Sequence, residues 1–69
     1  MNMKLYDVPR NSKIRIVEDP KTPVGSKTLR EGEILEFLHI DGIYSLCLDQ
    51  DGNPVHLSAF AEVEILKNM

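Results

Sequence analysis

Three basic side chains near the start of the chain, Arg10, Lys13 and Arg15, are the first candidates for ligand chemistry. Lys13 and Arg15 alternate with two isoleucines, and strand alternation places the two cations on one outward face. Such a cluster can follow a phosphate backbone, and its binding weakens steeply with salt. Lys27 and Arg30 join the cluster if the segment that carries them folds back. The alternative is a solvated strand face whose cations pair with acidic residues.

Flat side chains are the second set of candidates. His39 and Tyr44 flank an Asp41-Gly42 pair, and a two-residue hairpin turn there would place His39 opposite Tyr44. Rings at the rim of a fold can stack nucleobases, at roughly 1–3 kcal/mol each. The alternative is an ordinary cross-strand pair. For Phe60, which lies in a later turn, the alternative is a plug in the open end of the fold.

No constellation for covalent or metal chemistry is visible. There is no nucleophile with a spaced base and acid, and the four glycines are scattered in turns rather than gathered in a phosphate loop. His39 and Cys47 fall on neighbouring predicted strands, but we expect Cys47 to be buried and inert, because a reactive thiol needs access and a lowered pKa. Two histidines and one cysteine lack zinc-ligand spacing. We therefore expect no enzyme, metal or cofactor.

The elements that must position these residues are strands. Two Asp-Gly pairs, at 41–42 and 51–52, supply the positive φ angles of tight hairpin turns between runs of strand-forming residues. The predicted strands are 13–18, 33–40, 43–49, 54–58 and 62–67. Segment 33–40 also fits a helix, but its length and flanking glycines favour a strand that is apolar on both faces. We predict an all-β fold, a five-stranded, strongly bent antiparallel barrel.

Two irregular segments complete the predicted single domain, 1–69. A leader, 1–9, precedes the barrel, 12–67, and its residues 5–8 can form one helical turn before Pro9, with Leu5, Tyr6 and Val8 covering one end of the core. Segment 19–28 is rich in proline and glycine, which predicts an exposed loop. The predicted core consists of Ile14, Ile16, Leu35, Phe37, Leu46, Leu48, Val55, Leu57, Val63 and Ile65.

The length of the chain bounds its stability. A domain of 69 residues buries only roughly 60% of the surface that its unfolded form exposes. With no disulfide possible within the chain and no metal expected, oligomerisation is the remaining source of additional stability. There is no apolar run near 18 residues and no apolar signal-peptide core at the start. A lone cysteine on a predicted buried strand suits a reducing compartment, so we expect a cytoplasmic protein.

Charge is distributed unevenly. The net charge is −3, which argues mildly against nucleic-acid binding by the molecule as a whole. Residues 1–30 carry seven basic and three acidic side chains, a balance of +4. Residues 31–69 carry one basic and eight acidic side chains, a balance of −7. The asymmetry indicates a face for a polyanion or self-association of opposite faces, and the alternative is solvated surface of mixed sign.

Five short strands, with a long loop after the first and tight turns between the next three, resemble two families of small barrels. These are Src-homology-type domains and Sm-like RNA-binding proteins. The helical turn at 5–8 lies where Sm-like proteins carry their N-terminal helix. The segments 5–11, Leu-Tyr-Asp-Val-Pro-Arg-Asn, and 39–45, His-Ile-Asp-Gly-Ile-Tyr-Ser, are similar to a group of small marine phage (cyanophage-like) proteins. That likeness covers nearly the whole chain and implies an Sm-like fold.

Sm-like proteins read uracil-rich RNA with an aspartate and an asparagine between their second and third strands, and with an Arg-Gly pair between the fourth and fifth. This chain has Asp41 but no asparagine in the first of these turns, and no arginine in the turn at 58–61. The resemblance therefore carries over only Asp41 from the nucleotide pocket. It also implies a ring, in which the fourth strand of one subunit pairs with the fifth strand of the next.

We expect a non-enzymatic, Sm-like protein that binds RNA or single-stranded DNA as a homo-oligomeric ring, in an infected host cell if it is of phage origin. The expected nucleic-acid contacts are Arg10, Lys13, Arg15, Lys27, Arg30, His39, Asp41, Tyr44 and Phe60. The expected oligomer edges are Val55, His56, Leu57, Val63, Glu64 and Ile65. The alternative is a Src-homology-type protein-interaction module, a phage adaptor or assembly component, which grips a peptide with Tyr44 and Phe60.

Overall fold

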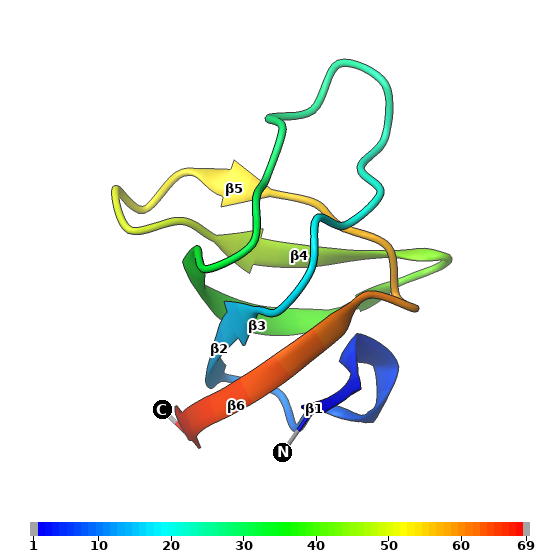
Figure 1. The fold of residues 1–69 in the computed structure, drawn as a ribbon. Coiled ribbons are helices and arrows are strands. Elements are labelled where there is room, and N and C mark those ends of the chain that lie inside the picture. Colours follow the sequence, from blue (N-terminus) through cyan, green and yellow to red (C-terminus); the bar gives the residue numbers. More distant parts are fainter. Residues whose placement is uncertain (1, 69) are drawn as a thin grey trace.

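Six antiparallel strands form one sheet in the computed structural model, which describes residues 2–68 (Figure 1). Met1, the first residue of the predicted leader, lies outside this range. The elements are β1 (Asn2–Lys4), the 3₁₀ turn η1 (Leu5–Asp7), β2 (Ser12–Ile16), β3 (Ile34–Asp41), β4 (Tyr44–Leu48), β5 (Pro54–Val55) and β6 (Glu62–Asn68). The all-β prediction is confirmed, and the predicted strand ends agree within two residues except in β5.

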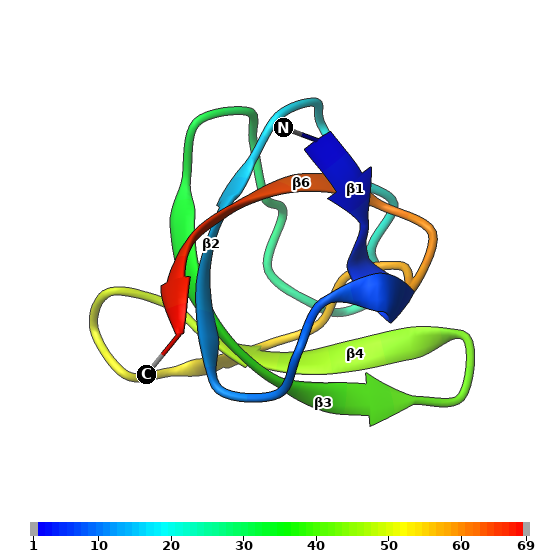
Figure 2. The same cartoon turned by 90° about the horizontal axis from the view of Figure 1, so that it is seen from below.

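The strands follow the order β1-β6-β2-β3-β4-β5, so β1 and β5 form the two edges of the sheet. The sheet coils strongly, as its end-on view shows (Figure 2). It does not close, and the prediction of a closed, five-stranded barrel is wrong on both counts. β5 ends after Val55, and the chain beyond it pairs with β4 only through an isolated bridge between Tyr44 and Ser58. A two-residue strand is too short to carry the ladder around to the other edge.

The N-terminal segment holds the strand that sequence patterns did not predict. The predicted helical turn forms as η1, and β1 before it pairs with β6. Backbone hydrogen bonds continue the attachment, from Leu5 N–H to the Ala61 carbonyl at 2.9 Å and from Tyr6 N–H to the Ala59 carbonyl at 3.0 Å. Leu5 is buried in the core as expected. Tyr6 does not cover the core but points into solvent.

The hairpin between β3 and β4 has a different register from the predicted one. Asp41 pairs with Tyr44, so the two-residue turn is Gly42-Ile43 rather than Asp41-Gly42, and His39 pairs with Leu46 rather than Tyr44. Gly42 has a φ of 67°, whereas the φ of Ile43 is not positive. This is the pattern of a type II′ turn, in which only the first central residue needs the left-handed region.

A β-bulge at Leu38 reverses the side-chain phase of β3. Phe37 pairs with Cys47, and the next pair is His39 with Leu46, which leaves Leu38 without a partner in the β3–β4 ladder. An extra residue in one strand shifts the inward–outward alternation by one position. Phe37 faces inward before the bulge and Ile40 packs against the core after it.

The phase of β4 corrects the predicted core. Ser45 and Cys47 are buried, whereas Leu46 and Leu48 lie half-buried on the outer face, so their placement in the core was wrong. The Ser45 hydroxyl is accommodated because it donates a hydrogen bond to the Leu57 carbonyl at 3.0 Å. The other eight predicted core residues are buried, except Ile65, which packs half-buried against the core. The core also includes Leu5, Val8, Leu29, Cys47, Ala59 and Ala61.

The long segment between β2 and β3 projects from the sheet as the predicted exposed loop (Figure 1). Leu29, just after the predicted loop at 19–28, is buried in the core. Backbone contacts fasten both ends of the loop. Ser58 N–H donates to the Lys21 carbonyl at 2.9 Å, and Glu31 N–H donates to the Asp19 carboxylate at 2.7 Å.

Candidate binding surface

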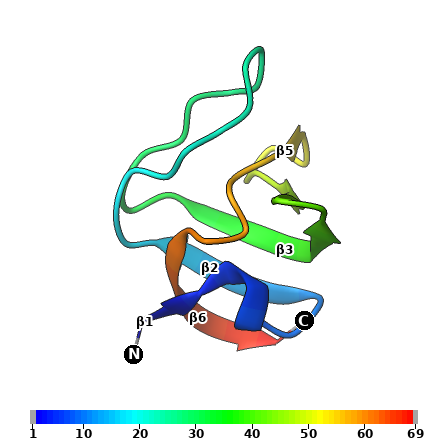
Figure 3. The same ribbon diagram turned by 90° about the vertical axis from the view of Figure 1, so that its right-hand side faces the viewer.

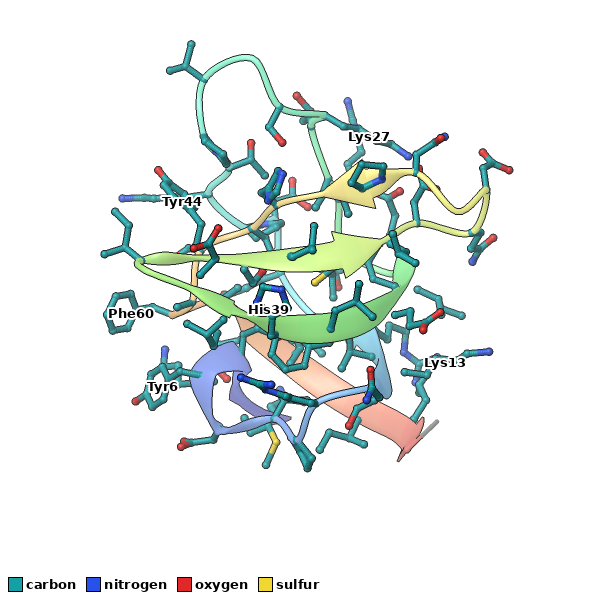
Figure 4. The ribbon with its side chains drawn as sticks, turned by 180° about the vertical axis from the view of Figure 1, so that it is seen from behind. Tyr6, Lys13, Lys27, His39, Tyr44 and Phe60 are labelled. Atoms are coloured by element: carbon teal, nitrogen blue, oxygen red, sulfur yellow. The ribbon has the colours of Figure 1, made fainter. Side chains whose placement is uncertain are left out.

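Two exposed aromatic rings lie together at one end of the molecule. The ring centroids of Tyr6 and Phe60 are 5.6 Å apart with an interplanar angle of 72°, an edge-to-face pair. Tyr6 is 49% exposed and Phe60 is 62% exposed, and both point away from the sheet (Figure 4). Phe60 therefore does not plug the end of the fold. The chain presents the pair to solvent.

Backbone hydrogen bonds fix the segments that carry these rings. Ala59 is the centre of the arrangement, because its carbonyl accepts from Tyr6 N–H at 3.0 Å and its N–H donates to the Ile43 carbonyl at 2.9 Å. Ser58 closes the turn, since its hydroxyl accepts from Phe60 N–H at 3.1 Å. Ile43 is itself exposed at the tip of the β3–β4 hairpin. Three apolar side chains thus project from adjoining, hydrogen-bonded backbone, which we define as the aromatic surface: Tyr6, Phe60 and Ile43.

A hollow of about 370 Å³ adjoins the Phe60 ring. It is lined by Glu18, Asp19, Lys21, Ser58, Phe60 and Glu62, among others. The carboxylate of Glu62 is paired with the Lys4 ammonium at 2.8 Å, and that of Asp19 accepts the Glu31 N–H. With Lys4 counted, three carboxylates face two lysines, so the hollow keeps a net charge of −1 and weakly favours a cationic group.

The predicted phosphate-binding cations do not form one surface. Arg15 is paired with Glu64 at 2.6 Å, and its guanidinium lowers the pKa of the Glu64 carboxyl. Lys27 is paired with Asp49 at 3.1 Å. Lys13 and Lys27 lie at the end of the sheet opposite to Tyr6 and Phe60 (Figure 4).

Three of the predicted cations remain without a counter-ion. Arg10, Lys13 and Arg30 make no ion pair within the part of the chain that the structure describes. Arg10 lies exposed in the turn before β2, and Arg30 lies exposed before β3. These cations are therefore available to an anion, and they lie on separate elements: the turn before β2, β2 itself and the segment before β3.

His39 and Tyr44 are diagonal neighbours on the outer face of β3 and β4, because Asp41 pairs with Tyr44 and His39 with Leu46. Asp41 is exposed at the end of β3. Cys47 lies on the inner face, away from His39, and burial raises the pKa of its thiol to about 11. The predicted burial of this cysteine is confirmed.

The two predicted oligomer edges differ in accessibility. Val63 pairs with Met3 on one side and Ile16 on the other, so this part of β6 lies inside the sheet. Glu64 is likewise paired on both sides, whereas Ile65 lies beyond the end of β1. At the other edge, Val55 and Leu57 are buried, and the His56 ring donates from Nδ1 to the Ser45 carbonyl at 2.9 Å.

Asp49 organises the β4–β5 turn and makes it sensitive to acid. Its carboxylate accepts from Asn53 N–H and Asp51 N–H at 2.9 Å each, and it pairs with Lys27. These contacts lower the pKa of Asp49 below its ordinary value of 3.8, and the hydrogen bond from Asn53 N–H has the largest effect. The contacts therefore stabilise the fold at neutral pH, and this contribution decreases as the pH falls below 3.8 towards the folded-state pKa.

We expect Asp49→Asn to lower the urea midpoint of unfolding at neutral pH, and the difference from the unmodified chain to shrink in acid. Asparagine retains an oxygen that can accept the two backbone hydrogen bonds but removes the charge. Urea unfolding at a series of pH values measures the effect. A difference that stays constant down to strong acid would contradict it.

Within residues 2–68, no group of histidine, cysteine and acidic side chains could hold a metal ion. No helix in the same range is long and apolar enough to cross a membrane. Comparison of the chain with protein-family models, curated proteins and solved structures found no match. The chemistry of the surface itself must therefore carry any functional conclusion.

Proposed function

We propose that the protein is a non-enzymatic binding module that holds an extended segment of a partner protein against the aromatic surface. The observation that supports this function is the exposed Tyr6–Phe60 pair on a hydrogen-bonded backbone. Rigid aromatic side chains dominate the binding energy of protein interfaces, and a surface fixed in advance loses little entropy on binding. The resemblance to small phage proteins would make the partner a host protein or another phage component.

The charge beside the rings indicates what the bound segment would contain. The acidic hollow next to Phe60 favours a lysine or arginine, and the rings favour an apolar side chain beside it. A basic, apolar segment also complements the net charge of −3. The partner segment is therefore expected to combine both kinds of side chain within a few residues.

Selection from a phage-displayed library of random short peptides tests this function. We expect enrichment of peptides with neighbouring basic and apolar residues. Phe60→Ala should weaken the binding of a selected peptide by about 30-fold, the loss typical of an aromatic anchor. Leu66→Ala is the control, because Leu66 is exposed on β6 outside the aromatic surface. No enrichment, or equal binding by the Phe60 variant, would refute the function.

Single-strand nucleic-acid binding by an Sm-like ring is the second candidate. It is favoured by the unpaired cations Arg10, Lys13 and Arg30, and the Tyr6 and Phe60 rings could stack bases. Titration of labelled oligouridylate at low and high salt tests it. Binding that weakens steeply with salt and with Arg10→Ala would support this candidate. Binding that is absent, or unchanged by salt, would exclude it.

A further inference from the structure

The N-terminal segment 2–8 attaches to the molecule as a separable piece. β1 is an edge strand that pairs with β6 alone, through Asn2–Lys4. Leu5 and Val8 place buried side chains in the core, and Lys4 makes its ion pair with Glu62. Figure 3 shows the segment lying against β6, with a single connection leading away to β2. All these contacts are therefore made to residues that follow the connection in the sequence.

The connection is a tight reversal at residues 9–11. Asn11 has a φ of 63°, and it is the only non-glycine residue in the described range with a positive φ. The Ser12 hydroxyl donates to the Pro9 carbonyl at 2.7 Å and holds the reversal closed. Asparagine tolerates the left-handed region better than most residues but still prefers extended backbone. Opening this turn would relax Asn11 and carry segment 2–8 away from its own core.

We propose that segment 2–8 exchanges between two copies of the chain to form a dimer. Every contact of the segment can form equally with the partner copy, and only the reversal at 9–11 changes, which is why such exchange costs little. A chain of 69 residues with no disulfide has marginal stability and benefits from association. Segment 2–8 of the partner copy fits the vacated surface, because that surface is already complementary to the same segment.

Exchange would complete each aromatic surface with a residue from the other chain. Tyr6 moves with the segment, whereas Phe60 remains on the body of its own chain. Each dimer would then carry two composite Tyr6–Phe60 pairs. The inference goes beyond the proposed function, and it is tested by molecular mass rather than by ligand binding, so the two can fail independently.

Charge reversal at the exchanged contact provides the test. Lys4→Glu and Glu62→Lys each place like charges where the structure has an ion pair of 2.8 Å. When the two variants are unfolded and refolded together, an exchanged heterodimer restores an attractive pair at both contacts. We expect sedimentation of the mixture to show a dimer, at twice the 7.8 kDa of the chain. The association constant should be roughly tenfold above that of either variant alone.

Arg15 and Glu64 provide the matched control. Their ion pair, at 2.6 Å, also joins β6 to a neighbouring strand, but β2 lies on the non-exchanged side of the reversal. Mixing Arg15→Glu with Glu64→Arg should therefore give no more dimer than either variant alone. Equal enrichment in both mixtures would overturn the proposal, because it would mean that β6 or another element exchanges. A monomeric Lys4/Glu62 mixture would overturn it as well.

Asn11→Gly tests the role of the reversal without altering any contact of segment 2–8. Glycine adopts a positive φ without the cost that asparagine carries, so the closed monomer should gain stability relative to the dimer. We expect a dimer fraction several-fold lower than that of the unmodified chain after refolding at the same concentration. A dimer fraction that is unchanged or higher would contradict a strained reversal as the cause of exchange.

Discussion

Phe37→Ala should lower the free energy of unfolding by about 3–5 kcal/mol, the range for removing a buried aromatic ring from a core. Phe37 is among the largest fully buried side chains and is 1% exposed. It lies immediately before the bulge at Leu38 and opposite Cys47, where β3 and β4 face the centre of the core. In a domain this small, little neighbouring structure can collapse into the cavity. Urea unfolding monitored by circular dichroism measures the loss.

Phe60→Ala is the matched control, since the chain has only these two phenylalanines. The Phe60 ring is largely exposed, so the same substitution should change the unfolding free energy by no more than about 0.5 kcal/mol. The two variants thus separate stability from binding, because only the Phe60 variant should lose affinity for a selected peptide. Equal losses of stability would place Phe60 in the core and contradict the structure.

Leu5→Ala should cost about 2–5 kcal/mol, although Leu5 lies in a single turn of 3₁₀ helix near the chain terminus. The side chain is 0% exposed, and its backbone N–H is bonded to Ala61. Its loss should loosen segment 2–8 as a whole. Chemical unfolding gives the total cost, and amide exchange at Val63, which pairs with Met3, reports the local loosening.

Leu66→Ala is the control for this substitution, because the same side chain on β6 is 37% exposed. We expect a loss below about 1 kcal/mol, since a half-solvated leucine leaves no closed cavity. If Leu5→Ala proved no more costly than Leu66→Ala, segment 2–8 would not belong to the cooperative core, and its exchange between chains would lose its energetic basis.

The elements of the fold were largely predictable because turn chemistry and alternation are local. Gly42 and Gly52 mark the two hairpin turns, and both have the positive φ that turns of this kind require. The phase of β4 was not predictable, because leucines dominate the outer face of that strand and Ser45 occupies the core. The bulge at Leu38 places Phe37 opposite Cys47, so Cys47 and Ser45 share the inner face with Phe37 and the leucines of β4 face outward. Nothing in the residue types around Leu38 indicates such a bulge.

Strand β1 and the aromatic surface were not predictable, because both depend on contacts between residues far apart in the sequence. Asn2–Lys4 carries no alternation and becomes a strand only because β6 offers an edge. Phe60 was a candidate from its place in a turn, but Tyr6 was not, because its partner lies at the far end of the sequence. Arg15 and Lys27 were identified as cations, yet their acidic partners become neighbours only in the folded chain.

The buried thiol of Cys47 has a practical consequence for labelling. With its pKa raised to about 11, the thiol stays protonated at neutral pH, and its burial shields it from electrophiles. A cysteine introduced at an exposed position such as Val24 would therefore react with a maleimide dye while Cys47 remains unlabelled. The natural sequence thus allows single-site fluorescent labelling without removal of its own cysteine.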